Sequence, residues 1–108
     1  MSLPAEETIR ERILKLLLQS SRPLSAAEIA AELGLDPRRA ERDIYEHLRH
    51  LAKTVKRRVP GYRIYMVPPT CLSCGYVFSN LDKPRKPSKC PRCRSQRIAP
   101  PRFYISRE

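Results

Sequence analysis

All four cysteines of the chain lie in its last third, as two Cys-x-x-Cys pairs separated by fifteen residues. The pairs are Cys71-Leu-Ser-Cys74 and Cys90-Pro-Arg-Cys93. Each pair has the length that bends the backbone into a knuckle presenting two thiolates to one metal, and two knuckles complete a tetrahedron. The spacing lies at the edge of the zinc-ribbon range, so it predicts one structural Zn²⁺ held by all four sulfurs.

Other uses of these cysteines are less favoured. Two disulfides would need an oxidising compartment, and the chain has no charged-then-apolar leader of a secretory kind, so we expect a cytoplasmic protein. A thioredoxin-like redox pair needs a βαβ context that neither pair has. Iron is the main competitor, because tetrahedral sulfur ligation suits iron as well as zinc, and a recombinant preparation could contain it.

Positive charge is concentrated in the second half of the chain. The 108 residues carry 22 Lys and Arg against 11 Asp and Glu, a net charge of +11. Residues 1–53 are neutral overall, whereas residues 54–108 have Asp82 and Glu108 as their only acids. Such a domain usually binds a polyanion, nucleic acid first, although a solvated surface or the ion pairing of a heat-adapted protein is an alternative. No apolar run is long enough to span a membrane.

Helical periodicity and capping residues predict three helices in the first half of the chain. The first is expected over residues 8–19, or from Pro4 if its first turn is included, and the second over residues 25–33. Gly34 then supplies the turn into a third helix, over about 37–53. Two helices joined by a short turn with glycine form a helix-turn-helix.

The third helix is expected to present a cationic face opposite its apolar stripe. Such a face can enter the major groove of double-stranded DNA, where Arg offers a bidentate fork to guanine. Weak ion pairs within the helix are the alternative use of the same charges. The residues predicted to contact DNA from this helix are Arg38, Arg39, Arg42, Tyr45, Arg49 and Lys53.

A basic β-hairpin is expected directly after the third helix. Residues 55–59 and 62–67 are rich in β-branched and aromatic residues and flank Pro60-Gly61, which predicts two paired strands. A hairpin here completes a winged helix-turn-helix. Its cations Lys56, Arg57, Arg58 and Arg63 would lie on phosphates or in the minor groove. A last strand, at about 102–106, could return to this hairpin or extend the ribbon.

The whole chain resembles small archaeal predicted transcriptional regulators in which a helix-turn-helix is fused to a rubredoxin-like zinc ribbon. The resemblance rests on the Leu33-Gly-Leu turn, Cys71-LSCGYVF, Pro-Ser-Lys-Cys90-Pro-Arg-Cys93 and Ile98-Ala-Pro-Pro-Arg-Phe. It implies an α+β fold, with a winged helix-turn-helix domain at residues 1–68, a zinc ribbon at 69–108, and DNA binding in transcriptional control. The chain departs from rubredoxins at Arg94, where they have glycine, which disfavours iron electron transfer.

These features predict a DNA-binding regulator, with the basic wing and the basic ribbon on phosphates and a purely structural metal. An enzyme is not expected, because the sequence shows no nucleophile–base pair, Gly-rich phosphate loop or carboxylate cluster. One alternative is an interaction module that docks on proteins of the archaeal transcription machinery. A second, less favoured, is an iron-binding redox protein. Monomer and homodimer both stay open.

Overall fold

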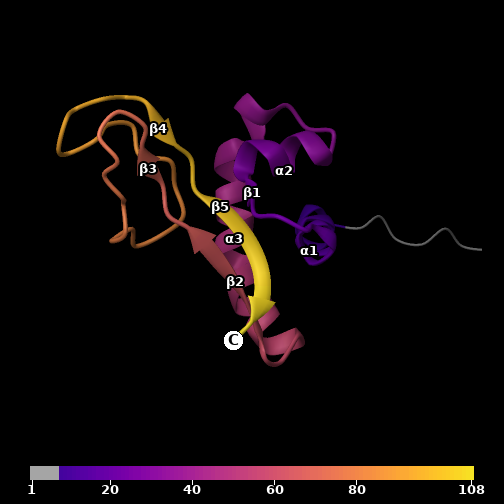
Figure 1. The fold of residues 1–108 in the computed structure, drawn as a ribbon. Coiled ribbons are helices and arrows are strands. Elements are labelled where there is room, and N and C mark those ends of the chain that lie inside the picture. The colour runs from indigo at the N-terminus through magenta and orange to yellow at the C-terminus, as the bar shows by residue number, and fades with distance from the viewer. Residues whose placement is uncertain (1–7) are drawn as a thin grey trace, which may run out of the picture.

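A computed structural model describes residues 8–108, as three helices, a three-stranded sheet and a small two-stranded sheet (Figure 1). The helices are α1 (Ile9–Gln19), α2 (Ala26–Glu32) and α3 (Pro37–Arg58). The strands are β1 (Leu24–Ser25), β2 (Tyr62–Val67), β3 (Thr70–Cys71), β4 (Ile98–Ala99) and β5 (Arg102–Arg107). The mixed α+β fold agrees with the prediction, while the extension of the first helix to Pro4 lies outside the described residues.

Local capping residues fix where α2 and α3 begin. The Ser25 hydroxyl accepts a hydrogen bond from the Glu28 backbone N–H at 3.1 Å, and the Glu28 carboxylate accepts one from the Ser25 N–H at 3.0 Å. This is the predicted capping box. Asp36 caps α3 in the same sense, and Gly34 turns the chain between the two helices with φ +76°.

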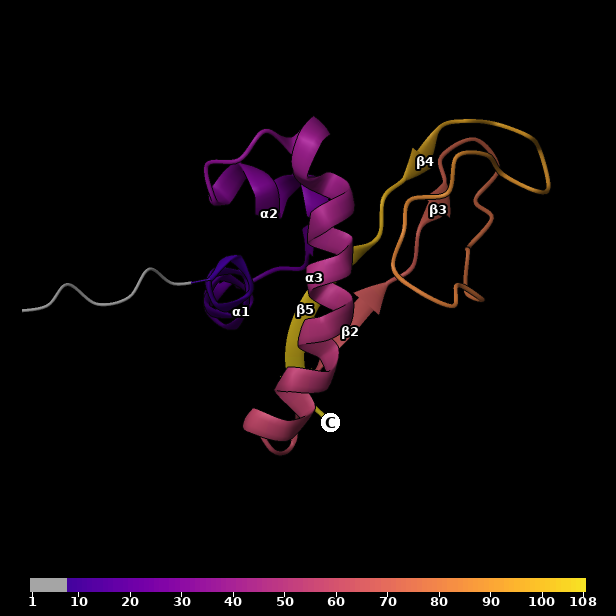
Figure 2. The same cartoon turned by 180° about the vertical axis from the view of Figure 1, so that it is seen from behind.

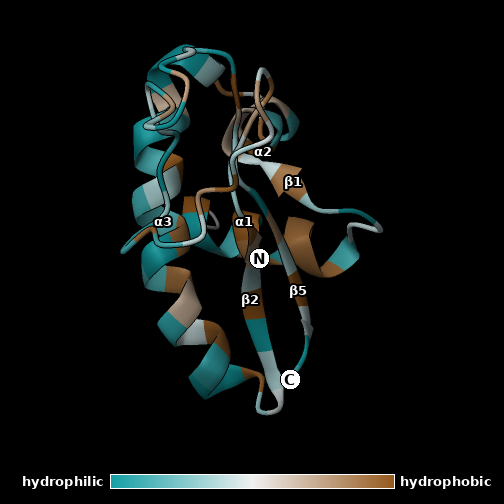
Figure 3. Ribbon diagram, turned by 60° about the vertical axis from the view of Figure 1, so that its left-hand side comes forward, coloured by the Kyte–Doolittle hydropathy of each residue, from teal (hydrophilic) through white to brown (hydrophobic). Residues whose placement is uncertain are grey.

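The main core lies between the three helices and the sheet formed by β1, β5 and β2, in that order (Figure 2). The helix faces turned toward the sheet are hydrophobic, whereas the outer side of α3 is largely hydrophilic (Figure 3). Ile64, Met66 and Ile105 pack against this core from the strands. Its most deeply buried large side chains are Ile13, Leu17, Ile29, Ile44, Leu48, Leu51 and Phe103.

The prediction of a strand at residues 55–59 is wrong. The third helix runs through this segment and ends at Arg58 rather than near Lys53. It continues because Leu51 and Val55 keep the helical spacing of four residues, and both are buried on its inner face. The strand predicted at 62–67 forms as β2, but its antiparallel partner is β5, with a register from Tyr62–Arg107 to Val67–Arg102.

The cysteine-containing segment, residues 68–101, is inserted between the two long strands of the main sheet. β3 and β4 pair at its base, and the knuckles lie beyond them, beside α3 (Figures 1 and 2). The chain crosses the boundary expected after residue 68 a second time, because β5, which follows the ribbon, is the central strand of the sheet that the helices cover. Within residues 8–108, no helix has the length and apolarity needed to cross a membrane.

Candidate metal centre and cationic groove

The four cysteine sulfurs meet at one point in the inserted segment. All four Sγ atoms lie within 4.8 Å of one another. The Sγ atoms of Cys71 and Cys93 are 3.5 Å apart, and those of Cys74 and Cys90 are 3.7 Å apart. Four sulfurs at about 2.3 Å from one Zn²⁺ form a tetrahedron with edges of about 3.8 Å. The thiols therefore fit a single tetrahedral metal ion, which these four residues could hold.

The two knuckles share one backbone geometry. The Gly75 N–H donates to the Cys71 carbonyl oxygen at 2.9 Å, and the Arg94 N–H donates to the Cys90 carbonyl oxygen at 2.9 Å. In both knuckles the residue after the second cysteine has a positive φ, +81° at Gly75 and +65° at Arg94. The left-handed conformation is free for glycine but costs a residue with a Cβ about 1–2 kcal/mol. The second knuckle therefore carries backbone strain that the first does not.

The surroundings of the thiols differ from one cysteine to the next. The backbone N–H of Tyr76, helped by the Arg92 guanidinium, lowers the pKa of the Cys74 thiol to about 6. The backbone N–H of Ser95 lowers the pKa of Cys93, but desolvation and the neighbouring thiols outweigh it and raise that pKa to about 12. Metal-free protein therefore keeps some of these thiols protonated, and a divalent cation is needed to hold four thiolates together.

Arg92 links the two knuckles. Its guanidinium donates to the Cys74 carbonyl oxygen at 2.7 Å and lies over the Tyr76 ring, 5.7 Å from the ring centroid. Tyr76 meets Phe78 edge-on, with ring centroids 5.0 Å apart. Phe78, Ile98 and two buried cysteines form the small core of this segment. So little apolar surface gives the ribbon limited stability of its own, and a bound metal would supply much of the rest.

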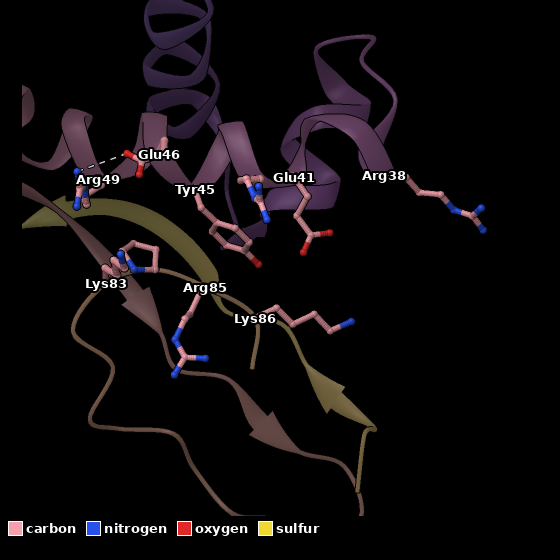
Figure 4. A pocket seen from close by; sticks show the side chains of 10 residues that line it. Arg38, Glu41, Tyr45, Glu46, Arg49, Lys83, Arg85 and Lys86 are labelled. Atoms are coloured by element: carbon pink, nitrogen blue, oxygen red, sulfur yellow. Dashed lines mark ion pairs between the residues drawn. The ribbon is translucent and has the colours of Figure 1, made fainter. Parts of the chain in front are cut away.

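A groove of about 650 Å³ lies between α3 and the loop that joins the two knuckles (Figure 4). We call it the cationic groove, because six of its ten lining residues are Arg or Lys and two are Glu. One wall comes from α3 and the other from residues 83–86. The lining residues are Arg38, Glu41, Arg42, Tyr45, Glu46, Arg49, Lys83, Pro84, Arg85 and Lys86.

The structure separates the predicted DNA-contact residues into two groups. Arg38, Arg42 and Arg49 line the cationic groove, and the Arg49 guanidinium lies 3.5 Å from Glu46. The other predicted cations are exposed outside it: Arg39, Lys53, Lys56, Arg57, Arg58 and Arg63. Arg39 and Arg63 form solvent-exposed ion pairs with Asp36 at 3.8 Å and Glu108 at 3.6 Å, and such pairs contribute little.

Lys56, Arg57 and Arg58 lie on the last turn of α3 rather than on a strand. Cations in this place interact favourably with the carbonyl end of the helix dipole. Of the three, Lys56 continues the cationic face of α3 beyond the groove into open solvent.

Tyr45 differs most from its prediction. The periodicity predicts it on the outward face of the helix, but it is only 9% exposed. Its ring packs edge-on against Phe103 of β5, with centroids 6.2 Å apart, because β5 covers this side of α3. Burial, and then the charge and close approach of the Glu41 carboxylate, raise the pKa of the Tyr45 hydroxyl, which stays protonated. This hydroxyl has no hydrogen-bond partner within residues 8–108, and it points into the cationic groove (Figure 4).

The loop cations Lys83, Arg85 and Lys86 were not named among the predicted contact residues, although the basic ribbon as a whole was expected on phosphates. Their signal in the sequence is a basic run between prolines, which indicates a loop but not what the loop faces. Their position opposite α3 depends on how the inserted segment sits on the helical part.

Both parts of the chain match known families. Residues 8–60 match the PF0610-like N-terminal domain, and residues 68–108 match the PF0610 rubredoxin-like zinc β-ribbon domain. The chain is PF0610-like in both halves. The solution NMR structure of protein PF0610 from Pyrococcus furiosus is 28% identical, with a TM-score of 0.64 and 100% of both chains covered. A comparison with curated proteins found no match. The match of residues 68–108 to a zinc β-ribbon agrees with the clustering of the four cysteines in this segment.

Proposed function

We propose that the protein is a DNA-binding transcriptional regulator with one structural Zn²⁺. Its order of elements supports a winged helix-turn-helix: three helices, a short β1 after the first helix, and two long antiparallel strands after the third. The zinc ribbon takes the place of the wing between β2 and β5. In this arrangement α2 and α3 form the helix-turn-helix, and α3 is the recognition helix.

The observation that carries the proposal is a continuous cationic stripe along α3. At about 100° per residue, five exposed cations fall within about 60° of one another on the helix surface. The stripe is about 27 Å long at 1.5 Å per residue, which is about four-fifths of one turn of B-DNA. Glu41 and Glu46 border it. The cations of the stripe are Arg38, Arg42, Arg49, Lys53 and Lys56.

The ribbon restricts how α3 can meet a duplex. Residues 83–86 stand across the cationic groove from the N-terminal half of α3, so the C-terminal half of the stripe is the open half. A major groove about 12 Å wide admits one helix. With α3 inserted, the loop cations Lys83, Arg85 and Lys86 would meet the neighbouring phosphate backbone. The ribbon then acts as a basic wing, and the zinc holds that wing in shape.

Binding of a random pool of duplex DNA at several salt concentrations tests this function. Neutralising about 5–8 phosphates gives a log–log salt slope of about −4 to −7. Selection of bound fragments from the same pool then measures sequence preference. If no salt-dependent binding occurs at low ionic strength, the DNA-binding proposal fails.

Zinc is the metal we propose, because four thiolates in a tetrahedron suit Zn²⁺ and the family model that matches this segment describes a zinc β-ribbon. When bound, the ion offsets two of the four thiolate charges and cross-links the two knuckles, while catalysis is not part of the proposal. Metal analysis of purified protein checks it. Red protein that contains iron instead of zinc would favour the redox alternative.

Docking on another protein of the transcription machinery is a second candidate function. Leu72, within the first knuckle, and Val77, three residues after it, are 61% and 47% exposed. Exposed apolar side chains on a small domain can serve as protein contacts. A pull-down with nuclease-treated protein compares wild type with a Leu72→Ser/Val77→Ser double variant. Capture that depends on these two residues, without DNA binding, would favour this candidate.

A further inference from the structure

The Tyr45 hydroxyl is buried without a hydrogen bond of good geometry, although the Glu41 carboxylate lies beside it. Its ring fills space against Phe103, and a phenylalanine would fill the same space. Burying a hydroxyl without a hydrogen bond costs about 1–3 kcal/mol. In residues 8–108, this oxygen is the buried side-chain polar atom that has no partner. A buried polar group of this kind indicates a ligand that supplies the missing acceptor.

The surroundings of the hydroxyl specify the charge of that ligand. The raised pKa keeps Tyr45 a hydrogen-bond donor. Figure 4 shows the hydroxyl directed toward the gap between α3 and the loop that carries Arg85 and Lys86. Arg42 lines the same groove from the helix side. A neutral donor between two walls of cations matches an acceptor that carries negative charge.

We propose that the cationic groove binds a phosphate group, with the Tyr45 hydroxyl donating a hydrogen bond to a phosphate oxygen. The groove volume of about 650 Å³ lies in the range of ligand sites, about 300–1,000 Å³. Walls on both sides leave room for one phosphate-bearing strand or one nucleotide rather than a duplex. If the phosphate belongs to DNA, this inference rests on the proposed function; if it belongs to a free nucleotide, it stands independently.

Two carboxylates in the groove oppose this ligand. Glu46 is engaged with Arg49 at 3.5 Å, but Glu41 is half-buried beside the Tyr45 hydroxyl. Its charge would repel a phosphate bound at Tyr45. Glu41→Gln removes the charge while keeping the shape, so it should tighten phosphate binding several-fold. Tighter binding by this variant would show that the ligand is an anion held beside Glu41, and the Tyr45→Phe comparison then tests the hydroxyl itself.

The test uses the zinc-loaded full chain and four probes: inorganic phosphate, adenosine monophosphate, a single-stranded deoxythymidine oligonucleotide and a DNA duplex. Tyrosine-ring NMR signals report binding of the small probes, and fluorescence anisotropy reports the labelled DNAs. We expect Tyr45→Phe to weaken the affinity for at least one probe by about 10- to 100-fold, as for loss of one hydrogen bond to a charged group. Tyr65→Phe is the matched control, because the Tyr65 hydroxyl donates to the Arg107 carbonyl on the main sheet.

The outcomes separate the source of the phosphate. Weakened binding of phosphate or the nucleotide identifies a free ligand, whereas weakening confined to the DNAs identifies a polynucleotide strand. The inference is overturned if Tyr45→Phe binds every probe as wild type does, or if wild type binds none at low ionic strength. Tyr45-dependent binding of a small probe without duplex binding would defeat the proposed function but not this inference.

Discussion

Tyr45 of α3 packs edge-on against Phe103 of β5, which joins the middle of the third helix to a strand that lies beyond the whole zinc-ribbon segment. Phe103 is 1% exposed and belongs to the main core, and β5 is the central strand of the sheet. The helical part is therefore complete only when the chain returns from the ribbon. The two halves are contiguous in sequence but share one core.

Phe103→Ala should consequently destabilise the helical part, although it lies in the C-terminal segment. Removal of a buried phenylalanine ring costs about 3–5 kcal/mol. Denaturant unfolding followed by helical circular dichroism measures this loss. Phe78→Ala is the control, because Phe78 belongs to the separate ribbon core. If Phe103→Ala left the helical transition unchanged, β5 would not contribute to the core as the structure shows.

Local features of the chain were predictable from sequence, because they depend on neighbouring residues. The capping box at Ser25 and the aspartate N-cap at Asp36 fix where two helices begin. Four cysteines in two short pairs predict a cluster of sulfurs. The end of α3 was not predicted, because β-branched residues at 55–59 suggested a strand. The helix continues instead, because Val55 extends its apolar stripe.

Features that depend on distant residues could not be read from the chain. The partner of β2 comes from the C-terminus, and nothing local to residues 62–67 names it. The burial of Tyr45 follows from the same return of the chain, since Phe103 covers a position that helical periodicity alone assigns to solvent. The cationic groove likewise needs both α3 and the distant loop at Arg85.

Tyr45→Phe should leave the fold as stable as wild type or more stable by about 1 kcal/mol, because it removes a buried hydroxyl that lacks a partner. The pH dependence gives a second readout. The folded-state pKa of Tyr45 is raised above the unfolded value of about 10, so the unfolded state releases this proton first. Wild type should therefore lose stability as pH rises above about 10, and Tyr45→Phe should lose less.

Denaturant unfolding at pH 8 and at pH 10.5, in wild type and variant, measures both effects. Tyr65→Phe is the control for removal of a tyrosine hydroxyl elsewhere in the fold. Equal losses in wild type and Tyr45→Phe would show that the Tyr45 hydroxyl is not held protonated by burial.

Exchanging the residues that follow the two knuckles should have opposite effects. Arg94 has φ +65°, a conformation that is unfavourable for a residue with a Cβ. Arg94→Gly should therefore stabilise the ribbon by about 1 kcal/mol relative to Arg94→Ala. The alanine variant controls for the lost charge. Gly75→Ala should destabilise it by about 1–2 kcal/mol. A Cβ at Gly75 would meet nothing within 4 Å, so its cost is backbone conformation alone.

Competition with a chelator measures these differences as metal affinity, since metal binding and ribbon folding are linked. A gain of about 1 kcal/mol corresponds to about fivefold tighter metal binding. Arg94→Gly and Arg94→Ala with equal affinities would exclude strain at this position.

Removal of the metal should disorder the ribbon but leave the helices folded. The main core contains no cysteine, and β2 can still pair with β5. Closing about 34 disordered residues between these strands costs about 3 kcal/mol, so stability should fall by up to that amount. Hydrogen exchange should show lost amide protection in residues 70–99 and kept protection in 44–55. Cys74→Ser should reproduce the effect of the chelator, whereas Ser73→Ala, at a neighbouring residue outside the cysteine cluster, should not.

The exposed end of α3 provides the most direct test of DNA binding. Arg57→Ala should weaken binding on all sequences alike and make the salt slope shallower by about one, because a phosphate contact is lost. Arg22→Ala is the matched control: it removes the same charge from a loop outside α3, where Arg22 pairs with Glu28 at 2.8 Å. Lys53→Ala, on the open half of the stripe, should instead relax sequence preference if α3 reads bases there. Equal effects of Arg57→Ala and Arg22→Ala would mean that net charge, rather than the surface of α3, attracts the DNA.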